Sequence, residues 1–93
     1  MPEFEWDENK RVNNLQKHRL DFVRAKLLFH GRPTLTFKTP RDGEERSATT
    51  GYLDGEFVTA IWTQRGEFVR LISVRRARHD ERRAYRSVYG SRD

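Results

Sequence analysis

The last quarter of the sequence holds a dense group of arginines. Eight arginines and no lysine lie between Arg70 and Arg92, and the acids within that stretch are Asp80 and Glu81. A planar guanidinium binds phosphate through two parallel hydrogen bonds and stacks on bases, which a lysine ammonium does less well. The pattern indicates phosphate or nucleic-acid binding. A solvated surface that pairs with the chain's own acids is the alternative.

Three of these arginines lie in a segment that otherwise reads as an apolar strand, which is an unusual place for a charge. If that strand is regular, Arg70 and Arg76 share one face, whereas Ser73 and Arg75 share the other. We expect the strand arginines to hold a phosphate and to offset its charge.

A second group of candidate residues lies near the N-terminus. Asn14, Lys17 and His18 follow Lys10 by 4, 7 and 8 residues, which places all four on one stripe of a helix. An imidazole with a pKa of about 6.5 can accept or donate a proton near neutral pH. His18 or Lys17 is therefore a candidate acid or base. A histidine favoured by the helix dipole, or one that only donates a hydrogen bond, is the alternative. The further residues predicted to bind nucleic acid are Lys10, Asn14, Arg78, Arg82 and Arg83.

Composition limits the class of protein. The 93 residues carry 19 basic and 14 acidic side chains, a net charge of +5, which favours RNA, DNA, an anionic membrane or an acidic protein as partner. The sequence has no cysteine, glycine-rich phosphate loop, nucleophile elbow or His-Glu-x-x-His motif, and its three histidines are scattered. We expect no metal or other cofactor. Without a membrane-spanning run or signal peptide, we expect a soluble, cytoplasmic protein.

The elements that must position these residues follow from periodicity. Asp7 is a good N-cap for a polar helix from Glu8 to about Arg19, in which Val12 and Leu15 are nearly the only side chains available for burial. The next segment, 22–29, is apolar around most of its circumference and is predicted to be the buried helix.

The middle of the chain has the period of two that is typical of strands. Asp42-Gly43 and Asp54-Gly55 suit type I′ hairpin turns between them. A last helix is expected over 78–90, with Asp80 rather than Arg78 as its cap. The sequence therefore predicts an α+β fold in which two helices precede an antiparallel meander and one helix follows it. The expected strands are 3–6, 34–38, 46–53, 56–64 and 67–76.

The order of these motifs resembles the BrnT family of type II toxins. The similarity runs from Phe4 to about Tyr89 and rests on W-D-x-x-K, followed by N and K-H at fixed spacing, and on R-x-I-S-x-R in the last strand. Arg78 replaces a frequent threonine, and 34–38 has no clear counterpart. The matching residues are Trp6, Asp7, Lys10, Asn14, Lys17, His18, Phe22, Arg70, Ser73, Arg75, Arg76, Glu81 and Tyr85.

The resemblance implies a single RelE-like domain over 1–93, an antiparallel meander with helices packed beside it. It implies a metal-independent endoribonuclease that cleaves RNA, inhibits translation and is neutralised by a BrnA-like antitoxin. That antitoxin would bind operator DNA, so this chain would reach DNA only indirectly. A non-catalytic nucleic-acid-binding or antitoxin-docking protein is the alternative. The predicted catalytic set is Lys17, His18, Arg70, Ser73, Arg75 and Arg76.

Overall fold

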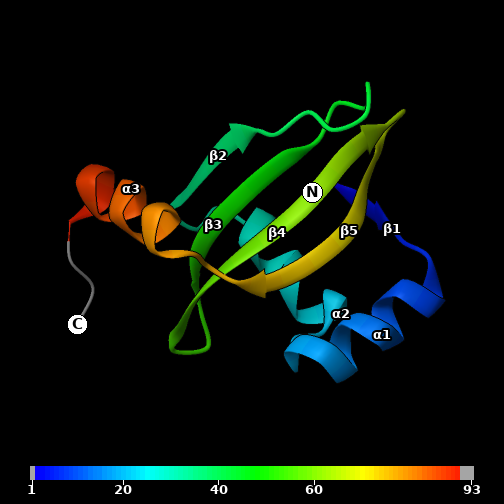
Figure 1. The fold of residues 1–93 in the computed structure, drawn as a ribbon, viewed down its shortest axis with the longest axis horizontal. Coiled ribbons are helices and arrows are strands. Elements are labelled where there is room, and N and C mark those ends of the chain that lie inside the picture. The colour runs from blue at the N-terminus through cyan, green and yellow to red at the C-terminus, as the bar shows by residue number, and fades with distance from the viewer. Residues whose placement is uncertain (1, 91–93) are drawn as a thin grey trace.

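The computed structural model describes residues 2–90, so Arg92 lies outside the described part. It has a five-stranded sheet in the order β1-β5-β4-β3-β2, two helices before the meander and one after it, which confirms the predicted α+β class (Figure 1). The elements are β1 (Glu3–Glu5), α1 (Glu8–His18), α2 (Phe22–Ala25), the 3₁₀ helix η1 (Lys26–Phe29), β2 (Thr34–Lys38), β3 (Ser47–Leu53), β4 (Glu56–Arg65), β5 (Phe68–Arg76) and α3 (His79–Tyr89).

Strands β2 to β5 form the predicted antiparallel meander. The turns Asp42-Gly43 and Asp54-Gly55 have positive φ at both residues, as type I′ turns require. The sheet is nevertheless mixed, because β1 pairs with β5 in parallel, from Glu3 beside Phe68 to Glu5 beside Arg70. The predicted antiparallel meander is thus confirmed, and β1 adds a parallel edge whose pairing the sequence did not predict.

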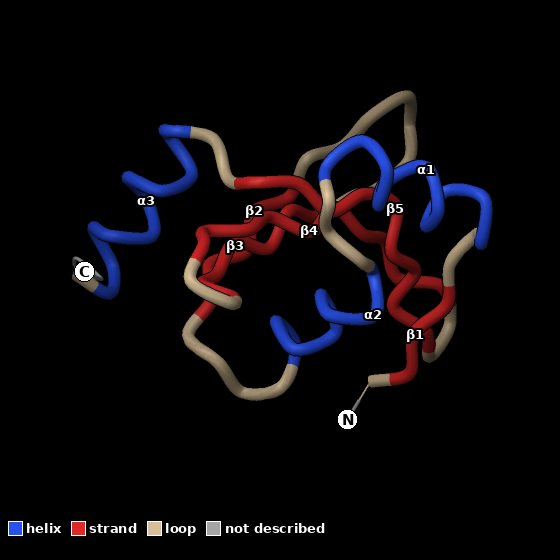
Figure 2. Tube along the Cα trace, turned by 90° about the horizontal axis from the view of Figure 1, so that it is seen from below, coloured by secondary structure: helices blue, strands red, loops and turns tan. Residues whose placement is uncertain are grey.

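Helices α2 and η1 cover one face of the sheet (Figure 2). Their buried residues Phe22, Ala25 and Leu28 are spaced by three, and the 3.0-residue turn of a 3₁₀ helix keeps Leu28 in line with the other two. This confirms the predicted buried helix, with its second half wound more tightly. The sheet residues of this core are Leu53, Val58, Ala60, Val69, Leu71 and Val74.

Helix α1 begins as predicted, with the Asp7 carboxylate accepting backbone hydrogen bonds from Asn9 and Lys10. Its buried side is not the expected one, however. Val12 and Leu15 are each 40% exposed, whereas Asn14 is only 7% exposed. The helix thus packs on the sheet through a polar residue.

The edge of β5 explains the burial of Asn14. Strand β1 pairs with β5 only as far as Arg70, so the next part of the β5 edge has no strand partner. The Asn14 amide takes that place: its Nδ2 donates to the Val74 carbonyl at 2.9 Å, and its Oδ1 accepts from the Val74 N–H at 3.0 Å. A buried amide is tolerated because its polar atoms are satisfied.

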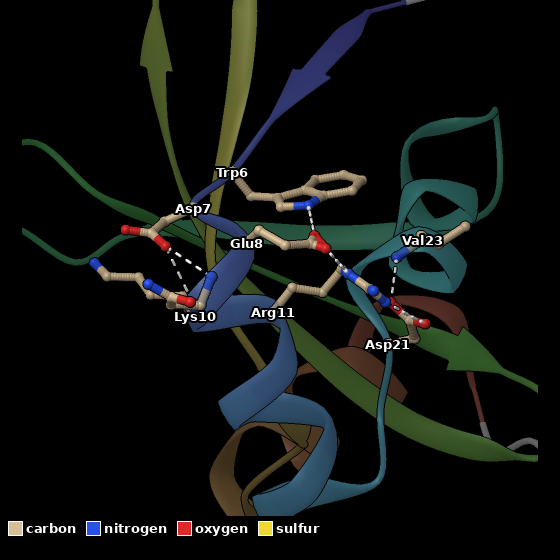
Figure 3. A network of polar contacts seen from close by, with 8 residues as sticks. Trp6, Asp7, Glu8, Lys10, Arg11, Asp21 and Val23 are labelled. Atoms are coloured by element: carbon tan, nitrogen blue, oxygen red, sulfur yellow. Dashed lines mark hydrogen bonds and ion pairs between the residues drawn. The ribbon is translucent and has the colours of Figure 1, made fainter.

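A polar network fixes the turns on either side of α1 (Figure 3). Trp6 Nε1 and Arg11 Nε donate to the Glu8 carboxylate, and Arg11 also donates to both oxygens of Asp21 at 3.0 Å. Asp21 in turn accepts from the Val23 N–H at the start of α2. The hydrogen bonds to Glu8 and then to Asp21 raise the pKa of the Arg11 guanidinium. The network sets the angle between α1 and α2.

Helix α3 starts differently from the prediction. Arg78, not Asp80, is the N-cap residue, and the Glu81 side chain accepts a hydrogen bond from the Arg78 N–H at 2.7 Å. An arginine side chain cannot accept a hydrogen bond, so only this half of a capping box forms. Tyr85, 1% exposed, anchors the helix by packing its ring on Phe57.

Candidate functional site

A β-bulge in β5 decides which face each site residue occupies. Ile61 pairs with Ser73 and Trp62 pairs with Leu71, so Ile72 is the extra residue. The alternation shifts there, and Arg70, Ser73 and Arg75 share the face opposite the α2 core. Arg76 lies on the other face. The expectation that Arg70 and Arg76 share a face is therefore wrong, because the strand is not regular.

The face opposite α2 carries a wide groove of about 920 Å³, here called the main groove. It lies between the C-terminal end of α1, the segment joining β2 to β3, and the N-terminal end of α3. Its floor is one row of paired residues across four strands: Phe37, Ala48, Ile61 and Ser73. Its basic lining consists of Lys17, His18, Arg41, Arg46, Arg75 and Arg78.

A second hollow continues from the main groove along the same face. It is lined by Lys10, Arg65 and Arg70, and Arg46 lines both hollows. Together the two hollows are lined by eight lysines and arginines and by three acids among residues 2–90. The excess of five positive charges equals the net charge of the whole chain. The positive charge is therefore concentrated on this face.

The strand arginines are all paired. Arg70 donates to Glu5 at 3.0 Å, and Arg75 donates to both oxygens of Glu81 at 2.7 and 2.9 Å. Arg76 donates to Glu56 and, at 2.8 Å, to the carbonyl of His18. Arg76 thus holds the end of α1 from outside the groove.

Glu81 is the centre of a buried polar cluster at one wall of the groove. Besides Arg75, it accepts hydrogen bonds from the Arg78 N–H and from Thr59 Oγ1, which also bonds to Thr50 at 2.7 Å. Burial raises the pKa of the Glu81 carboxyl, but these donors outweigh it and lower the pKa to about 2. The ionised carboxylate fixes the Arg75 guanidinium in place.

The unpaired charges lie at the rim instead. Within residues 2–90, the side chains of Lys10, Lys17, Arg41 and Arg78 have no hydrogen-bond or ion-pair partner. An unpaired cation beside a groove can neutralise an incoming phosphate without first breaking a contact. The rim cations therefore complement the fixed guanidinium of Arg75.

His18 lies in the main groove beside Lys17. Burial lowers its pKa, and so do the charges of Lys17, Arg75 and Arg76. The imidazole is therefore neutral at pH 7 and can accept a proton.

The other predicted residues separate into two groups. Ser73 lies on the groove floor with its Oγ 3.4 Å from Asn14 Oδ1, while Asn14 itself is committed to the β5 backbone and positions that strand. Arg82 donates to the Ala77 carbonyl, and Arg83 contacts the His79 ring. Neither Arg82 nor Arg83 lines the two hollows.

Sequence reasoning missed the basic residues of the β2–β3 segment. Arg41 lies outside every expected strand, and Arg46 is the first residue of the expected strand 46–53, one position before β3 begins. A signal for Arg46 existed: it precedes Ala48 by two residues, and the strand period puts both side chains on one face.

A comparison with protein families identifies the class of the protein. Residues 6–81 match the family model described as the ribonuclease toxin BrnT of type II toxin-antitoxin systems. The chain belongs to the BrnT family. It is thus a ribonuclease toxin with an RNA substrate and an antitoxin partner, and the predicted BrnT resemblance is confirmed.

The BrnT match includes α1 and the whole floor of the main groove, but it ends at Glu81, before Arg82 and Arg83. Among curated proteins the sequence has no significant match. In residues 2–90, no helix is long and apolar enough to cross a membrane.

Proposed function

We propose that the main groove cleaves RNA without a metal ion, by attack of a ribose 2′-hydroxyl on the adjacent phosphate. The products are a 2′,3′-cyclic phosphate and a free 5′-hydroxyl. One observation carries the proposal: an imidazole with a lowered pKa, an unpaired ammonium and four guanidinium groups line one groove above the Ser73 floor. This combination supplies a base and several cations for a phosphorane.

His18 is the general base of this proposal. Its lowered pKa keeps the imidazole unprotonated at neutral pH, so it can take the proton of the 2′-hydroxyl. Lys17, the adjacent unpaired cation, then donates a proton to the leaving 5′-oxygen or offsets its charge. The order of residues along α1 places both at its last turn.

Arg75, Arg78 and Ser73 hold the reacting phosphate. Arg75 is fixed by Glu81 and acts as a preorganised charge, whereas the free Arg78 side chain can move to the substrate. The Ser73 hydroxyl can donate a hydrogen bond to a phosphate oxygen. Arg76 binds the His18 carbonyl from outside the groove and does not contact the phosphate.

The second hollow extends the path of the RNA backbone. Lys10 and Arg70 line it, and Arg46 connects it to the main groove. We assign them phosphate contacts that add affinity without base preference. Arg82 and Arg83, whose side chains already have partners, contribute less to RNA affinity. We also propose that the reaction takes place in the cytoplasm, because the substrate is RNA.

Purified toxin, freed from its antitoxin, tests the reaction. It should cut single-stranded RNA in the presence of a metal chelator and leave a 2′,3′-cyclic phosphate. RNA with a single deoxyribose at the scissile position should bind and remain intact, since it has no nucleophile. If the deoxyribose substrate is cut at the same bond, or if the chelator stops cleavage, the mechanism is wrong. If RNA is bound but never cut, with or without ribosomes, the non-catalytic alternative holds for this copy.

The antitoxin proposed for this chain is a BrnA-like protein that binds operator DNA. Its acidic side chains would pair with the rim cations, and apolar contacts would add to them, because exposed ion pairs contribute only about 0–1 kcal/mol each. The complex co-expressed with the neighbouring gene product should therefore survive salt that releases RNA. Dissociation at the same salt concentration would mean a purely electrostatic contact and would contradict this model.

A further inference from the structure

Phe37 is an exposed aromatic residue on the floor of the main groove. The residue is 52% exposed and lies near the end of the edge strand β2. It is in register with Ala48, then Ile61 and Ser73, so all four side chains point to the same face. Three interstrand spacings of about 4.8 Å separate Phe37 from Ser73, roughly 14 Å across the groove.

The Phe37 ring is exposed to solvent because its cross-strand neighbour is small and no other aromatic ring among residues 2–90 packs on it. Ala48, its cross-strand partner, is a short side chain with 5% exposure, so nothing of similar height stands beside the ring. Among residues 2–90, every aromatic ring except Phe37 and Phe68 contacts another ring. Phe68 is in a different hollow, near the N-terminus. Phe37 is therefore the aromatic ring that faces the basic groove.

The surroundings of Phe37 indicate what would cover it. Lys17, Arg41 and Arg78 line the same groove without partners among residues 2–90, and a purely apolar partner would leave these charges unmatched. An unpaired nucleotide supplies both a phosphate for the cations and a flat base for the ring. Proteins that bind single-stranded nucleic acid combine a basic groove and an aromatic platform in this way.

We propose that Phe37 is a stacking platform for an unpaired nucleobase that flanks the scissile phosphate. The inference rests on the proposed function, because it takes the cleaved phosphate to lie near Ser73. It adds a binding subsite on the opposite side of the groove. It also requires single-stranded substrate there, since a paired base within a duplex does not offer its face.

Binding of an uncleavable RNA tests the subsite without turnover. The probe is a short single-stranded RNA with deoxyribose at the scissile position and 2-aminopurine substituted at successive neighbouring positions. Phe37→Ala should weaken binding roughly 5- to 150-fold, with an unchanged salt dependence, because a stacked base but no phosphate contact is lost. Phe37→Trp should restore binding. One 2-aminopurine position should be quenched by the wild type and by Phe37→Trp but not by Phe37→Ala.

Phe68→Ala is the matched control, because it removes a 39% exposed phenylalanine of the same sheet outside the groove. It should bind the probe like the wild type. Equal binding by Phe37→Ala and the wild type would overturn the inference, and so would loss of antitoxin affinity with RNA binding unchanged. Failure of the wild type to cleave natural RNA would instead count against the proposed mechanism, and the stacking result from the uncleavable probe would still decide the subsite.

Discussion

The two faces of strand β5 differ in what covers them. On one face, Val69, Leu71 and Val74 are buried under α2 and η1. On the other, Arg70, Ser73 and Arg75 line two open basic hollows. One side of the strand thus holds the fold together, and the other presents charge to the open hollows.

A single inserted residue makes this division possible. Without the bulge at Ile72, Ser73 and Leu71 would share a face and Arg75 would join them. The bulge puts Leu71 and Val74 into the core and sends Ser73 and Arg75 to the groove. Adjacent arginines, Arg75 and Arg76, then have different roles. Bulges beside active sites commonly redirect a side chain in this way.

The largest effect is expected from the groove histidine. His18→Ala should lower the cleavage rate about 10²- to 10⁴-fold, because the general base is lost. His30→Ala is the control, since His30 lines the hollow near the N-terminus. Equal activity of the two variants would remove His18 from the mechanism.

The pH dependence of the wild-type cleavage rate also tests whether His18 is the general base. The neutral imidazole is the active form, so the cleavage rate should rise with pH, with a midpoint below 6.5, the ordinary pKa of histidine, and then level off. A rate that instead falls as pH rises through this range would mean that protonated His18 is required.

Substitutions of the neighbouring Arg75 and Arg76 compare the two faces of β5 directly. Arg75→Ala should reduce cleavage roughly 10- to 1000-fold, as the loss of a charge stabiliser does. Arg76→Ala should stay within about threefold of wild type and lower the free energy of unfolding by about 1 kcal/mol or less. Single-turnover rates measure the effect of each variant on cleavage, and thermal unfolding measures its effect on stability. Similar cleavage losses for both variants would contradict the division between the faces.

Glu81 lies in the groove wall and also contributes to the stability of the fold. Its pKa of about 2 lies below the ordinary value of 4.5, so its ionised form stabilises the fold fully above pH 4.5, and that contribution is lost as pH falls toward 2. Glu81→Gln should cost on the order of 2–3 kcal/mol of unfolding free energy at pH 7, and the difference from wild type should shrink across that window. Asp80→Asn removes the adjacent charge and should change stability little. Equal losses in both variants would point to general charge repulsion rather than the Arg75 pair.

The smallest effect concerns backbone contacts along the second hollow. Lys10→Ala should lower the slope of log affinity against log salt by about 0.7, the value for one phosphate contact on a single strand. Arg83→Ala, outside both hollows, should leave the slope unchanged. A larger change from Arg83 than from Lys10 would move the RNA path onto α3.

Local patterns predicted most of the fold. The strands from β2 to β5, the Asp7 cap and the buried 22–29 segment all follow from periodicity and turn chemistry within a few residues. The parallel pairing of β1 with β5 joins residues 65 positions apart, and no local signal encodes it. The cap of α3 was misassigned because Glu81 binds a backbone N–H of a residue whose side chain cannot reciprocate.

The candidate site was predicted less completely than the fold. Four residue types in the sequence indicated a phosphate site, and the structure brings these residues into one groove: Lys17, His18, Ser73 and Arg75. The bulge was not foreseen, because Leu71 and Ile72 are both apolar and either one suits the core. Asn14 was assigned to RNA because burial of an amide depends on an unpaired strand edge that only the folded sheet reveals.

The proposed mechanism requires RNA to bind the face opposite α2. Backbone NMR of isotope-labelled toxin, titrated with the uncleavable deoxyribose-containing RNA, locates the RNA on the protein. We expect shift changes concentrated at Lys17, His18, Phe37, Ser73 and Arg78, with α2 and η1 nearly unchanged. Changes centred on α2, η1 and the N-terminal hollow, with the main groove silent, would contradict the proposed mechanism.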